Sequence, residues 1–380
     1  MILLILLVLP LTVFFSQKQQ EYRQHAAGNT NCGVTKNLDG TYHFSWLHVA
    51  GGKIVDQNNC GVILVGLNTA GLEFGDASGG DMTQSHIQQL SKMFNMNLWR
   101  VAINVSWWNN NNFVSSENMH YQDWIKQQIQ WMEQNGNYVE MDPTNYVTIS
   151  PATGGLPYCS NESNNPPPNP NCIPSQDTLN NPPWTEQQKV TATQQFWNSV
   201  VPLYANDPAI VYDALNEPYA PAFTNYYQDL NTMINTIQKL NPKALVFVYA
   251  NGVDQMVAGN LPDYSQQNLV FDFHPYPDPT NPWQDKFAHI QEWIPWIQNH
   301  NHAITIGEWG DPQLANNKPY ADAVINMVKT QGVATSYYNE GNMMSNGQLT
   351  SQGQVVQQEY ASLPPVIGSS TSLLHLDSMV

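Results

Sequence analysis

The chain has 380 residues, of which 42% are hydrophobic and 11% aromatic, enough to build one large domain or two ordinary ones. Its 30 acidic residues outnumber the 13 lysines and arginines and give a net charge of −17. Nucleic-acid binding needs clustered Lys and Arg, so this balance argues against a nucleic-acid partner. A neutral polar ligand fits the composition better.

The first fifteen residues, MILLILLVLPLTVFF, form an apolar run that is shorter than the roughly 20 residues of a membrane-spanning helix. We expect an export signal, and a short membrane tether through residues 1–15 is the alternative because Lys18 and Arg23 follow the run. Residues 1–35 are assigned to this signal or anchor with a polar linker, 36–365 to one domain and 366–380 to a C-terminal tail. The expected location is secreted or extracellular, with or without the tether.

Four cysteines allow three pairings, and their order along the chain favours Cys32 with Cys60 and Cys159 with Cys172. In an exported protein these would be disulfides, and four unpaired thiols are the alternative. The sequence contains neither CxxC nor HExxH spacing, so it implies no metal site and no cofactor.

Residues 36–60 come first among the predicted elements and indicate a hairpin that turns at Gly51-Gly52 and could plug the bottom of a barrel. Eight short runs rich in Val, Ile and aromatic residues then predict strands at 62–67, 98–103, 138–141, 210–215, 244–249, 269–273, 303–306 and 333–338. Amphipathic stretches between the strands predict helices at 85–94, 121–134, 185–203, 224–240, 287–299 and 320–330.

Strands this apolar suit a parallel sheet covered by helices, and eight of them match a (β/α)8 TIM barrel; a doubly wound open sheet is the alternative. Residues 143–183 are too rich in proline for a helix and predict a long insertion after the third strand, stapled by Cys159 and Cys172. The insertion would form a wall of the substrate cleft or, alternatively, a passive surface loop.

Two glutamates follow predicted strands: Glu217 in VYDALNEPY, residues 211–219, and Glu308 in IGEWG, residues 306–310. Active sites of (β/α)8 barrels lie at the carboxyl ends of the strands, so both side chains should point into one mouth. Paired carboxylates suit glycoside cleavage, in which one protonates the departing oxygen and the other attacks the anomeric carbon or activates water. An arbitrary glutamate is more often a solvated loop residue, but this chain has few charges.

Five motifs in order support one family: GVILVGLN, LWRVAIN, DALNEPY, FDFHPYP and IGEWG. Through them the chain from about residue 44 to residue 360 resembles glycoside hydrolase family 5, the cellulase family of retaining (β/α)8 glycosidases. The resemblance implies that Glu217 is the general acid/base and Glu308 the nucleophile.

Four further residues receive roles from the same resemblance. Asn216 would hold the sugar 2-hydroxyl and Arg100 would bind the nucleophile. His274 and Tyr276 would orient the carboxylates and the sugar. A cation and a phenol beside Glu308 would favour its ionised form and leave the proton on Glu217.

The sequence departs from the family pattern in two places. The third strand ends in Met141-Asp142-Pro143-Thr144 without the usual histidine, and the eighth has SYYNEGNMM in place of a tryptophan, so Tyr337, Tyr338 or Asn339 would stand in. Trp107, Trp108 and Trp309 follow strand ends, where flat rings could stack on sugar. For any single tryptophan a core position is the commoner outcome, and SWWNNNNF is the best exception because its polar neighbours predict a loop.

These observations predict a retaining endo-β-1,4-glucanase acting on cellulose or mixed β-glucan, with a polysaccharide or oligosaccharide as its partner. A β-mannanase or another family 5 glycosidase is the alternative within this class. A carbohydrate-binding pseudoenzyme and a structural surface protein are the alternatives from other classes.

Low charge leads to a separate hypothesis about pH. Only 11% of residues are charged, against about 25% in an average domain, so few ion pairs would be lost in acid. We expect an acid-adapted enzyme, the alternative being a bias in amino-acid usage.

Overall fold

The computed structural model describes residues 32–70, 82–114, 117–144, 186–218, 226–250, 261–277 and 282–369. Eight parallel strands form a closed barrel in which each strand pairs with the next along the chain and the last pairs with the first. The strands are β5 (Val65–Asn68), β6 (Leu98–Asn104), β9 (Tyr138–Thr144), β10 (Ile210–Asp213), β11 (Val246–Tyr249), β12 (Leu269–Asp272), β13 (Ala303–Trp309) and β14 (Ala334–Tyr337). The predicted TIM barrel is confirmed, and all eight predicted strands are present.

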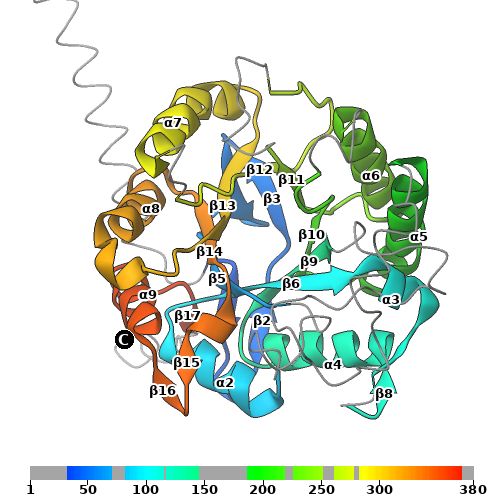
Figure 1. Cartoon of the computed structure of the whole chain (residues 1–380). Coiled ribbons are helices and arrows are strands. Elements are labelled where there is room, and N and C mark those ends of the chain that lie inside the picture. The colour runs from blue at the N-terminus through cyan, green and yellow to red at the C-terminus, as the bar shows by residue number, and fades with distance from the viewer. Residues whose placement is uncertain are drawn as a thin grey trace, which may run out of the picture.

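Helices surround the barrel as an outer ring (Figure 1). They are α2 (Gln84–Met93), α3 (Val105–Asn110), α4 (Tyr121–Glu133), α5 (Glu186–Tyr204), α6 (Tyr226–Leu240), α7 (Trp283–Asn299), α8 (Lys318–Gln331) and α9 (Ser351–Ala361), with short 3-10 turns η6 (Leu314–Asn316) and η7 (Glu340–Asn342). The sequence did not predict α3 or α9. In α9 the buried apolar side chains are only Val356 and Tyr360, too few for a clear amphipathic pattern.

The predicted hairpin is present as β3 (Leu47–Ala50) and β4 (Lys53–Asp56). Gly51 and Gly52 make its turn with φ of 59° and 75°, a backbone conformation that glycine adopts without steric cost. Its apolar side chains form one cluster with residues at the amino ends of the barrel strands, among them Val211, Phe247 and Val270. The hairpin therefore closes the end of the barrel opposite the catalytic mouth.

A small sheet of β1 (Val34–Lys36), β2 (Tyr42–Phe44) and β17 (Gly368–Ser369) shares this closed end. Short two-stranded hairpins β7–β8 (Phe113–Val114, Met119–His120) and β15–β16 (Met344–Ser345, Gln348–Leu349) follow the carboxyl ends of β6 and β14. They therefore belong to the side of the barrel where the strands end.

Cys32 is bonded to Cys60, which confirms one of the two predicted disulfides. Cys159 and Cys172 lie outside the described residues, as do nearly all of the insertion at 143–183 and the apolar run at 1–15. Within the described parts of the chain, no helix is both long enough and apolar enough to cross a bilayer.

Candidate active site

The structure brings the two predicted glutamates together at the carboxyl ends of the barrel strands. Glu217 lies just beyond β10, and Glu308 is the second-to-last residue of the long strand β13. One carboxylate oxygen of each, together with a ring nitrogen of His274, lies within 4.8 Å of the others. The two acids can therefore act on one bond of a bound molecule.

Glu217 has a backbone conformation that is unusual for its residue type. Its φ of 40° lies in the left-handed region, and the following residue is Pro218, which restricts the backbone before it. Strain of this kind costs about 1–3 kcal/mol and persists where the surroundings enforce it. The side chain is 44% exposed, so a substrate can reach it.

Glu308 is held by two donors from other strands. Arg100 Nη1 contacts Oε1 at 2.5 Å, and Tyr276 Oη donates to Oε2 at 2.7 Å. Only 8% of the Glu308 side chain is exposed. A charged and a neutral donor thus fix the carboxylate in one orientation.

His274 connects the two glutamates through its buried ring. Nδ1 lies 2.7 Å from Glu217 Oε1 and 3.6 Å from Glu308 Oε2, while Nε2 lies 3.1 Å from Asp272 Oδ2. Burial alone would lower the pKa of His274, but the surrounding carboxylates outweigh burial and raise this pKa well above its usual range. These carboxylates therefore favour the protonated imidazole, in which both nitrogens can donate.

The contact with His274 also changes the pKa of Glu217. Burial would raise the pKa of Glu217, but the hydrogen bond and positive charge of His274, with the charge of Arg100, lower it instead. These contacts favour the ionised form of Glu217 before substrate binds, whereas the sequence-based expectation considered only Arg100 and Tyr276 and placed the proton on Glu217. The same contacts favour a proton on the His274 imidazole beside Glu217.

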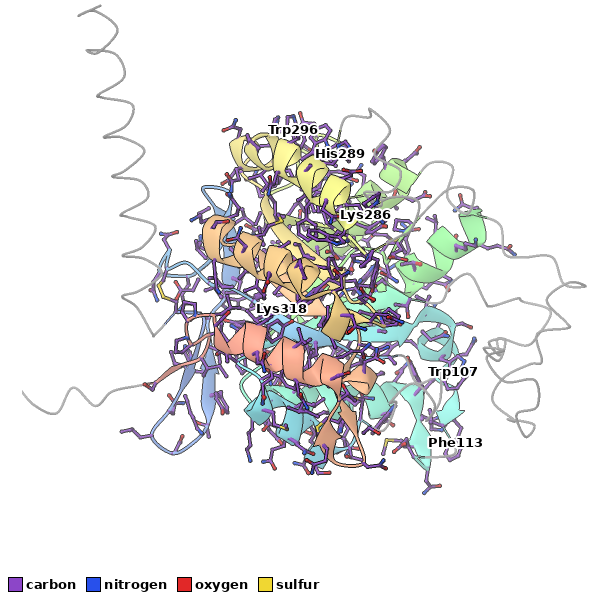
Figure 2. The ribbon with its side chains drawn as sticks, turned by 60° about the vertical axis from the view of Figure 1, so that its left-hand side comes forward. Trp107, Phe113, Lys286, His289, Trp296 and Lys318 are labelled. Carbon is purple, nitrogen blue, oxygen red and sulfur yellow. A yellow bond between two sulfur atoms is a disulfide. The ribbon has the colours of Figure 1, made fainter. Side chains whose placement is uncertain are left out.

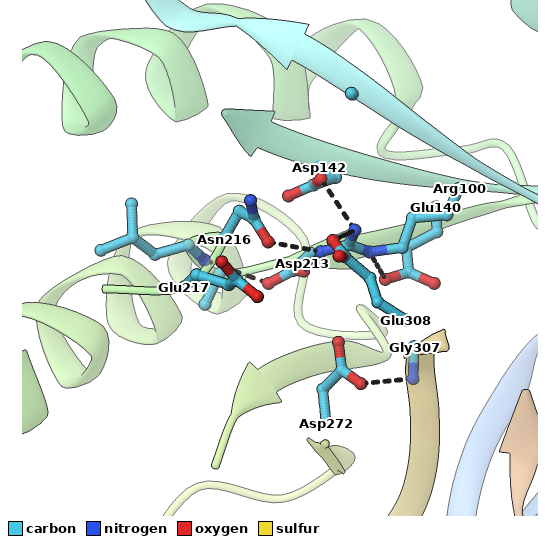
Figure 3. Close-up of polar contacts among 12 residues, drawn as sticks. Arg100, Glu140, Asp142, Asp213, Asn216, Glu217, Asp272, Gly307 and Glu308 are labelled. Atoms are coloured by element: carbon cyan, nitrogen blue, oxygen red, sulfur yellow. Dashed lines mark hydrogen bonds and ion pairs between the residues drawn. The ribbon is translucent and has the colours of Figure 1, made fainter. Parts of the chain in front are cut away.

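Arg100 is 1% exposed and lies among the acids and amides that surround Glu308 (Figure 3). Besides Glu308, its nitrogens contact five acids or amides that lie in β5, in β9 and in or just beyond β10. These contacts are Nε with Glu140 at 3.1 Å, Nη1 with Asn68 at 3.0 Å and Asp142 at 3.1 Å, and Nη2 with Asp213 at 2.8 Å and Asn216 at 2.9 Å. A lysine would not serve here, because only the planar guanidinium presents donors in several fixed directions.

A family model described as Cellulase (glycosyl hydrolase family 5) matches residues 55–343, which is most of the chain. The chain belongs to glycosyl hydrolase family 5. It is therefore a glycoside hydrolase, and its substrate is a carbohydrate. A comparison with curated proteins found no match.

Solved structures with the same fold share little sequence with this family 5 hydrolase. The catalytic domain of Thermobifida fusca endoglucanase Cel5A is 15% identical, with a TM-score of 0.56, covering 83% of this chain and 97% of that one. Endo-glycoceramidase II from Rhodococcus sp., solved as a lactosyl-enzyme intermediate, is 20% identical, with a TM-score of 0.56, covering 82% and 80%. An endogalactoceramidase is 16% identical, with a TM-score of 0.58, covering 84% and 85%. At these identities the likeness concerns the fold.

Three buried acids surround Arg100 in this family 5 hydrolase. Burial raises the pKa of Asp213 to about 6, although Arg100 opposes the rise. The pKa values of Glu140 and Asp142 are raised well above the usual range, again by burial and against Arg100. Oxygens of Glu140, Asp213 and Asp272 lie within 4.8 Å of one another, and Arg100 already supplies positive charge beside them.

Sequence reasoning assigned no role to Asn68, Glu140, Asp142, Asp213, Asp272 or the buried Glu340, whose carboxylate accepts from Ala70 N. A signal was present, because Glu140 and Asp142, like Asp272 and His274, are two residues apart. Alternate residues of a strand face the same side. Polar side chains at this period within apolar runs therefore indicate a charged barrel interior.

The three tryptophans predicted to contact sugar are buried instead. Trp107 and Trp108 lie in α3, which Asn104 caps through its side chain, and they are 4% and 1% exposed. Figure 2 shows Trp107 and the exposed Phe113 of β7 on the same side of the molecule. Trp309 is fully buried, with its ring edge-on to Tyr337 at 4.9 Å between centroids. The predicted loop is a helix, and in this structure none of the three rings presents a face to a ligand.

The eighth strand offers Tyr338 in place of the usual tryptophan. Tyr337 is 1% exposed and packs against Trp309, whereas the half-buried Tyr338 lies edge-on to Tyr276 at 6.4 Å. Burial and the charge of Glu308 raise the pKa of Tyr338 to about 12. Of the three residues left open by the sequence, Tyr338 is therefore the one whose ring lies beside Tyr276, which binds Glu308.

Proposed function

We propose that this chain is a retaining endo-β-1,4-glucanase that hydrolyses cellulose or mixed β-glucan through two glutamates. The observation that supports the proposal is that one carboxylate oxygen of Glu217 and one of Glu308 lie within 4.8 Å of each other. Retaining glycosidases hold their carboxyl groups about 5 to 5.5 Å apart, whereas inverting enzymes leave about 6.5 to 9.5 Å for a water. The short separation favours direct attack by one carboxylate.

In the first step, a Glu308 oxygen forms a bond to the anomeric carbon as the bond from that carbon to the leaving oxygen breaks. Glu217 gives a proton to the leaving oxygen. In the second step, water attacks the anomeric carbon and gives its proton to Glu217, while the bond to Glu308 breaks. Arg100 and Tyr276, which contact opposite oxygens of Glu308, hold the nucleophile in line for both steps.

A second candidate is cleavage of the β-glycosidic bond that joins a sugar to a lipid. It is favoured by the structural likeness to endo-glycoceramidase II and endogalactoceramidase, which is as strong as the likeness to the endoglucanase. The sequence lacks the usual histidine after β9 and has Tyr338 where a tryptophan is usual. Both positions would contact sugar near the point of cleavage, so both changes would alter substrate preference. Both candidates use the same two glutamates.

Release of reducing sugar from cellulose, mixed β-glucan, mannan, xylan and lactosylceramide distinguishes the candidates. The proposal expects the fastest turnover on a β-glucan, with the β-anomer appearing first in the proton NMR spectrum. Faster turnover of mannan or lactosylceramide would replace the glucanase assignment, and an initial α-anomer would refute retention. Binding without turnover on every substrate would favour a carbohydrate-binding pseudoenzyme.

We also propose that the protein acts outside the cell. The Cys32–Cys60 disulfide supports this location, since such bonds persist in oxidising compartments. Detection of the mature protein in culture medium, rather than in the cell lysate, tests it.

A further inference from the structure

Asp272 is a fully buried acid that is connected to both glutamates through an intervening group, although it touches neither of them. Its Oδ2 lies 3.1 Å from His274 Nε2, and His274 Nδ1 in turn lies 2.7 Å from Glu217. Its Oδ1 accepts from the backbone N–H of Gly307 at 2.7 Å, one residue before Glu308. One carboxylate thus connects to Glu217 through a ring and to Glu308 through a peptide.

Gly307 shows how closely Asp272 is fitted to this place. A Cβ at position 307 would lie 2.3 Å from both Asp272 oxygens, far inside contact distance. The Gly307 carbonyl accepts from Asn68 Nδ2 at 3.0 Å, so the peptide is held on both sides. Glycine is therefore the one residue here that lets the acid pack beneath the Glu308 strand.

His274 can hold a proton on each nitrogen only if both nitrogens face acceptors. Asp272 provides the acceptor for Nε2, and Glu217 and Glu308 face Nδ1. Glu140 and Asp213 lie beside Asp272, with Arg100 bonded to both of them. The ring is therefore a place where the proton needed by Glu217 can be stored 2.7 Å from its acceptor.

We propose that Asp272 is a positioning residue for the reaction proposed above, on which this inference rests: it keeps His274 protonated on both nitrogens and anchors the peptide that carries Glu308. When substrate binds, the Nδ1 proton of His274 passes to Glu217. Glu217 then passes this proton to the leaving oxygen. After water has attacked, the proton returns by the same path. No electrons are exchanged, and each proton has a named donor and acceptor.

Asp272→Asn tests the connection to His274 while leaving the peptide anchored. The amide oxygen can still accept from Gly307 N–H, but the –NH₂ group then faces His274 Nε2, which must give up its proton. In ¹⁵N-histidine NMR of the substrate-free protein, wild-type His274 should carry protons on both nitrogens at neutral pH. In Asp272→Asn its pKa should fall by about 1 to 3 units, the effect expected of one neighbouring opposite charge.

Asp213→Asn is the matched control, because it neutralises an acid of the same cluster that bonds Arg100 and not His274. It should move the His274 titration much less. Gly307→Ala displaces Asp272 without neutralising it, and should lower the His274 pKa as well. A wild-type His274 that is neutral at neutral pH would overturn the proposal, even if no variant folds. An equal shift in Asp272→Asn and Asp213→Asn would overturn it too.

Kinetics provide the second readout. Asp272→Asn should lower kcat/KM on an unactivated β-glycan about 10-fold or more, with a much smaller loss on an aryl glycoside whose leaving group needs little protonation. Equal losses on both would refute a role through Glu217. If wild-type protein cleaves no glycoside at all, the proposed function fails, while the His274 titration still decides the role of Asp272.

Discussion

Glu133 and Asp207 offer a test of acid adaptation far from the catalytic site. Glu133 is the last residue of α4, and its half-buried carboxyl is hydrogen-bonded to that of Asp207, which precedes β10. Two carboxyls can share such a bond only when one is protonated. Burial, with the neighbouring charge and hydrogen bond of Asp207, raises the pKa of Glu133 from 4.5 to about 8.

The direction in which stability changes with pH follows from proton binding by Glu133. Between pH 4.5 and about 8 the folded protein binds more protons than the unfolded chain, so stability is full below pH 4.5 and falls as pH rises through about 8. The pKa difference between 4.5 and about 8, at about 1.36 kcal/mol per pH unit, corresponds to about 5 kcal/mol in the free energy of unfolding. The pair is partly open to solvent, which screens the interaction, so we expect about 2 kcal/mol to be realised.

Glu133→Gln removes the dependence, because an amide donates to Asp207 at every pH. Urea unfolding of the variant should give a higher free energy of unfolding than wild type above pH 8, by about 2 kcal/mol, and a similar value near pH 4.5. Glu292→Gln makes the same change on α7, where the side chain is 73% exposed, and should leave the pH dependence unaltered. Parallel stability curves for wild type and Glu133→Gln would refute proton sharing.

Three further predictions concern the catalytic groups. Glu308→Gln should lose nearly all turnover on every substrate, because no nucleophile remains; substantial hydrolysis by the variant would assign the nucleophile elsewhere. Glu217→Ala should keep activity on aryl glycosides with acidic leaving groups and lose it on glycans, and equal losses would contradict its role as acid. Tyr276→Phe removes the 2.7 Å hydrogen bond to Glu308 and should lower kcat/KM about 10-fold, as expected for a bond to a charged group; an unchanged value would show that Arg100 alone suffices.

The barrel was predictable because its strands are buried on both faces and read as short apolar runs between amphipathic helices. Glu217 and Glu308 were predictable because each follows such a run. The partners of Arg100 were not, since their convergence depends on the register of strands distant in sequence, such as β6 and β9. The contacts of His274 with Glu217 and Glu308 were not predictable for the same reason, because these glutamates come from strands distant in sequence.

Local chemistry explains the remaining misses. The asparagines of SWWNNNNF predicted a loop, but Asn104 begins helix α3 through its side chain and Asn111 ends it with a φ of 48°. Polar residues at both ends of a short apolar segment therefore marked helix caps. Asparagine is favoured at both positions, which is why composition alone could not separate the two outcomes.

Arg100 also limits how this enzyme can evolve. Its guanidinium compensates Glu140, Asp142, Asp213 and Glu308 at once, so losing it would leave four buried carboxylates without their cation. A change at any one of these acids alters the charge felt by the others, and neutral drift at single positions is therefore restricted. Substitutions among these residues are therefore expected to be tolerated only in combinations that keep the buried charges balanced.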